Sequence, residues 1–264
     1  MDHLLRSLAP ISDDGWKLLD EEARTRLAPS LAARKLIDFS GPHGWQHSAT
    51  NLGRAVALAD TPAEGVSGVQ RRVLPLLEAR ADFELSRAEL RDADRGADDV
   101  DLAALDEAAR RIAFAENAAV FTGWSDAIAG IGEVTPHERL PLGAPGSYPS
   151  TLARAVETLL DSGISGPYGL ALGTEHYRRA IESVEGGYPL VSHMREILDG
   201  PIVRAPGVGG GVVVSMRGGD FVFESGQDLS VGYTSHDDDL VQLYLEESFS
   251  FHVATPEAAV VLEP

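Results

Sequence analysis

The chain has 264 residues and no cysteine, and its 41 acidic and 22 basic residues give a formal net charge of −19. The lack of cysteine excludes disulfides, thiolate metal sites and cysteine nucleophiles, and the acidic excess opposes nucleic-acid binding through phosphates. No apolar run approaches the roughly 18 residues of a membrane span, and the first residues lack the apolar core of a secretory signal. We therefore expect a globular, cytoplasmic protein with neither a nucleic acid nor a membrane as partner.

The first half of the chain combines helical patterns with one long polar β-rich stretch. Ser12 can cap a helix that continues to Leu27 with apolar residues at helical spacing. Residues 51–85 have a β-like pattern, few apolar side chains and a polar tip at 60–68. A two-stranded excursion of this kind cannot bury its faces within its own subunit, so we expect it to lie on a neighbour. Residues 101–121 give the strongest helical pattern and begin with acidic residues, which suit the positive end of a helix dipole.

The second half of the chain alternates short helices with β-rich segments. Glycines crowd the stretch 208–219, which raises the possibility of a phosphate-binding loop, but no lysine and no helical pattern follow them. We therefore predict that the β-rich residues 212–214 and 220–224 form a hairpin across Gly218 and Gly219. Residues 239–253 alternate apolar with more polar side chains and predict a long, half-buried strand. The fold class is α+β.

None of the polar clusters makes a convincing catalytic or metal site. His43 and His47 follow a Gly-Pro turn, which disfavours a helical metal-binding pair. His236 precedes three aspartates that read as a solvated acidic turn before the last strand. Asp92 and Asp94 are flanked by arginines, which indicates ordinary ion pairs. With no G-x-S-x-G or H-E-x-x-H motif, we expect no enzyme and no metal site.

Seven stretches in a fixed order carry a resemblance that spans nearly the whole chain. They are LLRSLAPIS near the start, ARKLIDFSGPHGW at 33–45, DRGADDVDL at 94–102, SGPYGLAL at 165–172, GGYPL at 186–190, RGGDFVFESGQDLSVGY at 217–233 and LYLEESFSF at 243–251. Together they resemble the encapsulin shell proteins of family 1, the linocin-like group. The resemblance implies the capsid fold of tailed phages, the Hong Kong 97 type, with a P-domain, an E-loop and an A-domain.

The same resemblance implies a division of the chain and a function. The expected segments are 1–50 for the N-terminal helix and arm of the P-domain, 51–85 for the E-loop and its flanking strands, 86–134 for the P-domain with its spine helix, 135–222 for the A-domain, and 223–264 for the return to the P-domain. Such subunits self-assemble into an icosahedral shell, here expected to hold about sixty copies. The shell lies in the cytoplasm and encloses a ferritin-like protein or a dye-decolorising peroxidase that carries a C-terminal targeting peptide. The implied role is iron storage or defence against oxidative stress.

The alternative on the same fold is a phage or prophage major capsid protein. Some phage capsids join their subunits by a bond between a lysine of the E-loop and an asparagine. Residues 51–85 contain no lysine, and the chain is acidic. Both features favour the encapsulin interpretation.

For cargo binding, the resemblance implies a groove between the N-terminal helix and the hairpin stretch near the end. Exposure separates this interpretation from the alternative that the apolar members belong to the core, because groove residues should be partly accessible in an empty shell. The matching positions are Leu27, Leu31, Arg34, Asp38, Leu229, Val231 and Tyr233.

A second site implied by the resemblance is a pore at the five-fold axis. Two adjacent glycines let a backbone approach an axis closely, and a glutamate beside them would favour cations; the alternative is a plain turn between helices. Some encapsulins bind flavin at a tryptophan where this chain has Ala88, so no flavin, and no other cofactor, is predicted. The pore residues are Val184, Glu185, Gly186, Gly187 and Tyr188.

Overall fold

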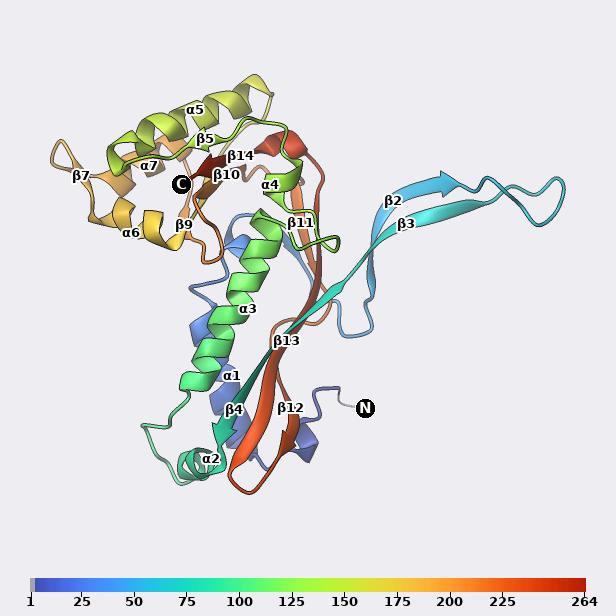
Figure 1. Cartoon of the computed structure of the whole chain (residues 1–264), viewed down its shortest axis with the longest axis vertical. Helices are drawn as coiled ribbons and strands as arrows, with labels where there is room; N and C mark the ends of the chain where they lie inside the picture. Colours follow the sequence, from blue (N-terminus) through green and yellow to red (C-terminus); the bar gives the residue numbers. More distant parts are fainter. Residues whose placement is uncertain (1–2) are drawn as a thin grey trace.

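The computed structural model describes residues 3–264, so Met1 and Asp2 of the predicted segment 1–50 lie outside it. Two β-sheets, a long helix beside the first of them and one projecting hairpin make up the chain (Figure 1). In the described part, no helix is both long and apolar enough to cross a bilayer.

The first sheet is organised around one long strand, β13. On one edge β13 pairs with β4, and on the other it pairs first with β12 and then with β11, which continues to β1. The strands are β1 (Asp38–Ser40), β4 (Leu77–Ser86), β11 (Phe221–Ser225), β12 (Ser230–His236) and β13 (Leu240–Val253).

The predicted strand at 239–253 is confirmed as β13, but part of its second face is buried as well. Its apolar side chains face the core, where Phe249 stacks on Phe223 with ring centroids 4.7 Å apart. The opposite face is covered too: Arg80 lies over the Tyr244 ring at 3.7 Å, and Thr50 bonds Ser250 at 2.6 Å. The expectation of a half-buried strand therefore holds only in part, because residues distant in sequence also bury Tyr244, Ser248 and Ser250 on the second face.

Two predicted helices are confirmed and pack with the first sheet. Helix α1 (Asp13–Leu27) starts at Ser12, whose hydroxyl accepts a hydrogen bond from the Gly15 N–H at 2.9 Å. Helix α3 (Ala103–Phe121) packs against α1, β4 and β13 and buries Leu105, Ile112 and Val120. The shorter helices nearby are α2 (Arg87–Asp94), α4 (Ile131–Val134), η1 (Arg6–Leu8) and η2 (Ala33–Lys35).

The second sheet has the order β5–β14–β10–β6–β9 and lies among three helices (Figure 1). The chain's last strand belongs to it, so the predicted segment 223–264 contributes to both sheets. Its strands are β5 (Leu140–Pro141), β6 (Tyr168–Leu172), β9 (Ile202–Arg204), β10 (Gly211–Ser215) and β14 (Ala259–Glu263). The helical elements here are α5 (Tyr148–Asp161), α6 (Thr174–Glu182), α7 (Leu190–Leu198), η3 (Pro145–Ser147) and η4 (Pro256–Ala258).

The predicted hairpin across Gly218 and Gly219 is wrong. Strand β10 pairs with β6 and β14 in the second sheet, whereas β11 pairs with β1 and β13 in the first. Both glycines do have positive φ, 88° and 83°, so a turn is present. This turn connects the two sheets, because the strand before it and the strand after it each pair with other strands on both edges.

The predicted excursion is confirmed as the β2–β3 hairpin, formed by β2 (Ala49–Ala57) and β3 (Val69–Pro75). Within residues 3–264 these strands pair only with each other, and the hairpin extends away from the rest of the molecule (Figure 1). Most of its residues are exposed, including Val56, Val69 and Val73. Residues 77–86, placed next to the E-loop by the prediction, form β4 of the first sheet.

Candidate functional site

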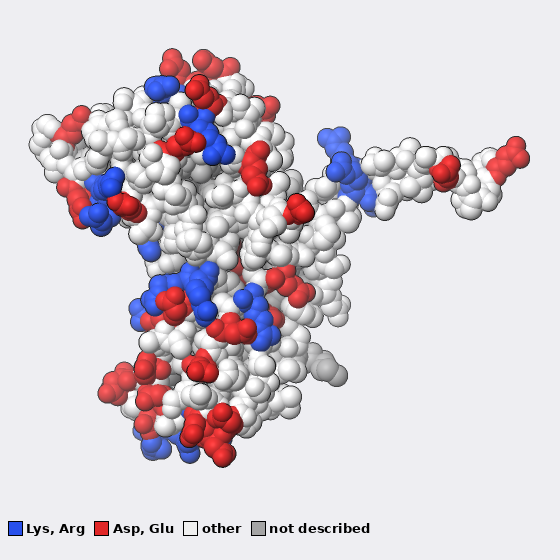
Figure 2. All heavy atoms as spheres, viewed as in Figure 1, with Lys and Arg blue, Asp and Glu red and all other residues white. Residues whose placement is uncertain are grey.

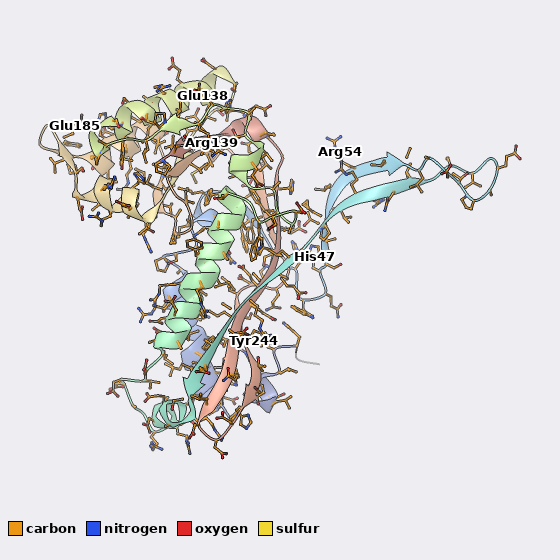
Figure 3. The ribbon with its side chains drawn as sticks, in the orientation of Figure 1. His47, Arg54, Glu138, Arg139, Glu185 and Tyr244 are labelled. Carbon is orange, nitrogen blue, oxygen red and sulfur yellow. The ribbon has the colours of Figure 1, made fainter. Side chains whose placement is uncertain are left out.

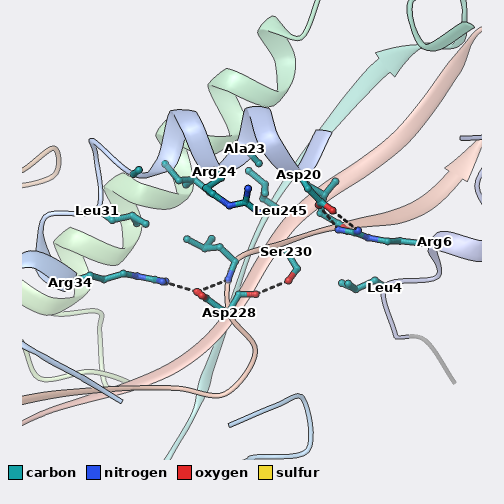
Figure 4. Close-up of a pocket in the computed structure, with 14 residues that line it drawn as sticks. Leu4, Arg6, Asp20, Ala23, Arg24, Leu31, Arg34, Asp228, Ser230 and Leu245 are labelled. Atoms are coloured by element: carbon teal, nitrogen blue, oxygen red, sulfur yellow. Dashed lines mark hydrogen bonds and ion pairs between the residues drawn. The ribbon is translucent and has the colours of Figure 1, made fainter. Parts of the chain in front are cut away.

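A groove between α1 and β12 is the largest candidate site, with a volume of about 550 Å³ (Figure 4). Residues from α1, from the turn after it and from the segment that leads into β12 form its walls, and the N-terminal segment closes one end. We call it the α1–β12 groove. It is lined by Leu4, Arg6, Asp20, Ala23, Arg24, Leu27, Ala28, Leu31, Arg34, Asp228, Leu229, Ser230, Val231 and Leu245.

One buried asparagine holds the turn that follows α1. The Asn117 side-chain oxygen accepts hydrogen bonds from the backbone N–H groups of Ala32 and Ala33, at 2.9 and 3.1 Å. Its amide nitrogen donates to the carbonyls of Ser30 and Pro206, at 2.8 and 3.0 Å. Four bonds satisfy this side chain fully. They tie the turn to α3 and thereby fix where Leu31 and Arg34 lie.

The apolar residues of the groove differ in exposure, and the difference decides their role. Leu27 is 5% exposed, Leu31 8% and Val231 1%, so these three form a packed floor that continues into the core. Leu229 is half-buried and presents accessible apolar surface. By the criterion of exposure, Leu229 fits a groove residue, whereas the three floor residues fit the core interpretation.

The N-terminal segment forms one lip of the groove through Arg6. The Arg6 guanidinium donates to both Asp20 carboxylate oxygens, at 2.8 and 2.6 Å, and its Nε donates to the Val231 carbonyl at 2.8 Å. It also lies over the Trp16 ring, 4.7 Å from the centroid. A hydrogen bond from the Tyr233 N–H to the Leu4 carbonyl, 2.9 Å, holds the same segment against β12.

The other end of the groove contains what we call the Arg34 cluster, Arg34 with Glu116, Asp228 and Glu247. Arg34 Nε donates to Glu116 Oε2 at 2.8 Å, Nη1 to Asp228 Oδ1 at 2.6 Å, and Nη2 to Glu247 Oε2 at 2.9 Å. The Glu116 and Glu247 side chains are 0% and 1% exposed, whereas Asp228 is 43% exposed at the groove surface. One guanidinium therefore faces three carboxylates that come from α3, β13 and the loop before β12.

The two buried carboxyl groups of the Arg34 cluster, Glu116 and Glu247, have raised pKa values. Burial raises the pKa of Glu116 and, together with the charge of Glu116, raises the pKa of Glu247 well above its ordinary value. The Oε1 atoms of both carboxyl groups are buried without a hydrogen-bond partner in the described structure. Two ionised carboxylates would leave these oxygens desolvated and mutually repelling. We therefore expect one of the two groups to keep its proton at neutral pH.

Replacing Glu247 with glutamine is expected to flatten the pH dependence of stability. A carboxyl group with a raised pKa in the folded state binds a proton that the unfolded chain releases, so wild-type stability falls as pH rises above the ordinary glutamate pKa. The slope is about 1.4 kcal/mol per pH unit until the folded-state pKa is reached. Thermal unfolding between about pH 5 and pH 8 measures it. Glu78→Gln, an exposed change on β4, should keep the wild-type slope, and a Glu247→Gln slope equal to it would contradict the shared proton.

Two predicted groove residues lie elsewhere. Asp38, at the start of β1, accepts a hydrogen bond from the Gly219 N–H at 2.5 Å and stabilises the crossover between the sheets. The Tyr233 hydroxyl bonds His236 Nδ1 at 2.6 Å, next to the acidic turn at 237–239 that joins β12 to β13. Neither residue lines the α1–β12 groove. Their predicted part in cargo binding is therefore not supported by their positions.

The predicted pore residues form a small loop at an extremity of the second-sheet region, where Figure 3 labels Glu185. Strands β7 (Val184–Glu185) and β8 (Tyr188–Pro189) pair across Gly186 and Gly187, whose φ values are 58° and 86°. The side chains of Val184 and Tyr188 are exposed, and Glu185 lies 3.6 Å from His193. The connection between α6 and α7 is therefore a short hairpin.

No other part of the described chain offers an obvious chemical centre. Across residues 3–264, no three His, Asp or Glu side chains gather in a way that could hold a metal ion. His47 instead bonds Glu224 at 2.6 Å, and the His43 ring lies beside the His47 ring at a tilt of 46°, with 4.9 Å between the ring centroids. Ala88 lies in the first turn of α2, where its N–H donates to the Ser86 hydroxyl at 3.1 Å.

The known proteins that this chain resembles in sequence are encapsulin shell proteins. Residues 1–250 match the Linocin_M18 family model, described as an encapsulating protein for peroxidase. The type 1 encapsulin shell protein of Rhodospirillum rubrum is 47% identical, over 99% of this chain and 96% of that protein. The corresponding protein of Rhodococcus erythropolis is 39% identical over 99% of this chain and 100% of its own length. That of Mycobacterium tuberculosis is 36% identical over 99% of both.

Solved structures share the fold at low sequence identity. The virus-like particle from Pyrococcus furiosus matches with a TM-score of 0.63 at 19% identity, over 94% of this chain and 99% of that chain. The capsid of an empty GTA particle matches with a TM-score of 0.54 at 14% identity, over 88% and 96%. The predicted α+β class and the capsid fold of tailed phages are thereby confirmed.

Proposed function

Since this chain belongs to the type 1 encapsulin shell-protein family and has the matching capsid fold, we propose that it encloses a cargo enzyme held by a C-terminal targeting peptide. The shell is the smallest icosahedral one, with about sixty copies. It forms a cytoplasmic nanocompartment. The cargo is a peroxidase or a ferritin-like iron protein, which serves oxidative-stress defence or iron storage; the description of the matching family as an encapsulating protein for peroxidase supports the first.

The observation that carries the cargo proposal is the α1–β12 groove. Its packed floor of Leu27, Leu31 and Val231 is continuous with the accessible Leu229, which suits apolar anchors of an extended peptide. Each fully buried leucine or isoleucine anchor contributes about 1.5–3 kcal/mol. Polar groups of the peptide meet Asp228 and Arg24 at the rim.

Mass spectrometry of shells purified from the native host tests the proposal. The expected result is one abundant second protein that has a short C-terminal extension beyond its folded domain. Deleting that extension should empty the shells without changing their size. Shells that keep this protein after the deletion would show that the groove does not hold its C-terminus.

Deleting residues 60–67 is expected to weaken assembly, because the β2–β3 hairpin buries its surface on a neighbouring copy. The hairpin pairs with no other strand in the described part of its own chain, and strand edges left open in one subunit are commonly satisfied by another. Negative-stain microscopy and gel filtration measure the yield of closed shells. Normal shells from the shortened chain would contradict the role of the hairpin.

Replacing Glu185 with lysine is expected to slow the entry of ferrous ions into loaded shells several-fold. We propose that the β7–β8 loop rings the five-fold axis, where exposed Glu185 would make a cation-selective opening. Stopped-flow iron oxidation measures entry. Glu175→Lys, an exposed change on α6, is the control, and equal rates for both variants and the wild type would contradict a gate at Glu185.

A further inference from the structure

The β2–β3 hairpin carries three arginines without a partner. Arg54, Arg71 and Arg72 are all exposed, and no hydrogen bond or ion pair is formed by their side chains within residues 3–264. Figure 2 shows these basic atoms gathered on the part of the hairpin nearest the body, and Figure 3 labels Arg54 there. Most other basic side chains of this acidic protein are paired, as Arg26 is with Glu22 at 2.6 Å.

The register of the hairpin places two of these like charges side by side, which destabilises the strand pairing within a single subunit. Arg54 lies directly opposite Arg72 on the neighbouring strand. Residues in that relation share a face, and like charges there destabilise the pairing. The acidic residues of the hairpin, Asp60 and Glu64, lie in the tip beyond the paired strands. The hairpin therefore cannot neutralise its own arginines.

Both faces of the hairpin combine a positive charge with accessible apolar surface. Successive side chains along a strand point to opposite faces, so Arg71 lies on the face opposite to Arg72. Arg54 and Arg72 share their face with Val56, and Arg71 shares its face with Val73; both valines are about half exposed, 52% and 50%. A strand pair with this composition on both sides suits burial between two surfaces that supply carboxylates.

We propose that Arg54, Arg71 and Arg72 bind carboxylates of neighbouring copies of this chain, so that ion pairs made by the hairpin control shell closure. This inference rests on the proposed assembly of the shell. A second copy is the occupant that fits, because the chain carries a net charge of −19 and its hairpin is its basic extension. Charge complementarity of this kind sets register and association rate and weakens with salt.

The test compares charge reversal on the hairpin with a matched change elsewhere. Arg54→Glu/Arg72→Glu and Arg71→Glu reverse the two faces separately, and Arg54→Lys/Arg72→Lys keeps the charge. Arg154→Glu reverses another exposed arginine, on α5, that has no ion-pair partner in the described chain and lies outside the α1–β12 groove. Light scattering and analytical ultracentrifugation give the protein concentration at half assembly across a series of NaCl concentrations.

The expected result is at least about a tenfold rise in that concentration for the reversed variants, with a salt dependence weaker than that of the wild type. The lysine pair and Arg154→Glu should assemble as the wild type does. Unchanged assembly of the reversed variants would overturn the inference. A lower thermal midpoint of the unassembled subunit, compared with the wild type at a concentration where neither assembles, would also overturn it, because it would place the arginines' role inside the subunit. Nucleic acid recovered with wild-type shells and lost from the variants would also overturn it. A wild-type chain that forms no shells would instead contradict the proposed function.

Discussion

Replacing Arg34 with alanine is expected to lower the free energy of unfolding by about 3–5 kcal/mol, the usual effect of removing one partner from a buried ion pair. Three carboxylates would lose their cation, and two of these, Glu116 and Glu247, are almost fully inaccessible to water. Burial works against the charged guanidinium, but the carboxylates outweigh it and raise the pKa of Arg34. The charge on this side chain is therefore permanent.

Thermal unfolding measures the effect, which corresponds to a decrease in midpoint of roughly 10 °C for a chain of this size. Arg24→Ala, which removes an arginine from the rim of the same groove, should change the midpoint little. Combining Arg34→Ala with Glu247→Gln should restore part of the loss, because the second buried carboxyl group can then no longer ionise and repel Glu116. The guanidinium carbon of Arg34 also lies 5.0 Å from the Phe39 ring centroid and 5.5 Å from that of Phe223. If the second substitution restored none of the lost stability, Arg34 would act through its packing on these rings and not through its ion pairs.

Aspartate at two positions of the same groove wall is expected to have opposite consequences. Val231 is 1% exposed, so Val231→Asp places a charge in the core and should destabilise the subunit by roughly 4 kcal/mol or more. Leu229 is half-buried at the surface of the groove. Leu229→Asp should therefore leave folding and assembly intact but remove an apolar contact and add a charge where the peptide binds, giving intact shells that are empty.

Co-expression with the cargo separates these outcomes, since gel filtration reports assembly and the ratio of cargo to shell protein reports loading. Val231→Ala and Leu229→Ala serve as matched changes without charge. Intact, normally loaded shells of Leu229→Asp would contradict binding at this wall. Intact shells of Val231→Asp would show that the position is accessible in the assembled protein.

Local sequence patterns predicted the helices and the long strand well, because caps and apolar spacing act within a few residues. Ser12 caps α1 as its hydroxyl chemistry suggests, and the alternation after Leu240 marks β13. The pairing of strands depends instead on distant residues. Gly218 and Gly219 have the backbone of a turn, yet β10 and β11 belong to different sheets because each has better partners far along the chain.

In the candidate site, too, contacts between residues distant in sequence were not predicted. The resemblance supplied Leu27, Leu31, Arg34, Leu229 and Val231, which do line one groove. The carboxylates around Arg34 were missed, although Glu247 occupies an apolar-face position between Leu245 and Phe249, a signal visible in the alternation itself. Arg6 and Asp20 gave no such signal, because their contact depends on how the N-terminal segment folds back onto β12.

Cryo-electron microscopy of particles purified with their cargo tests the central claim most directly. The account predicts a closed icosahedral shell in which the α1–β12 groove of each subunit faces the lumen and contains density for an extended peptide. The β2–β3 hairpin should lie across a neighbouring copy. A shell with this groove on its outer surface, or with the groove covered by a neighbouring subunit and closed to the lumen, would contradict the account.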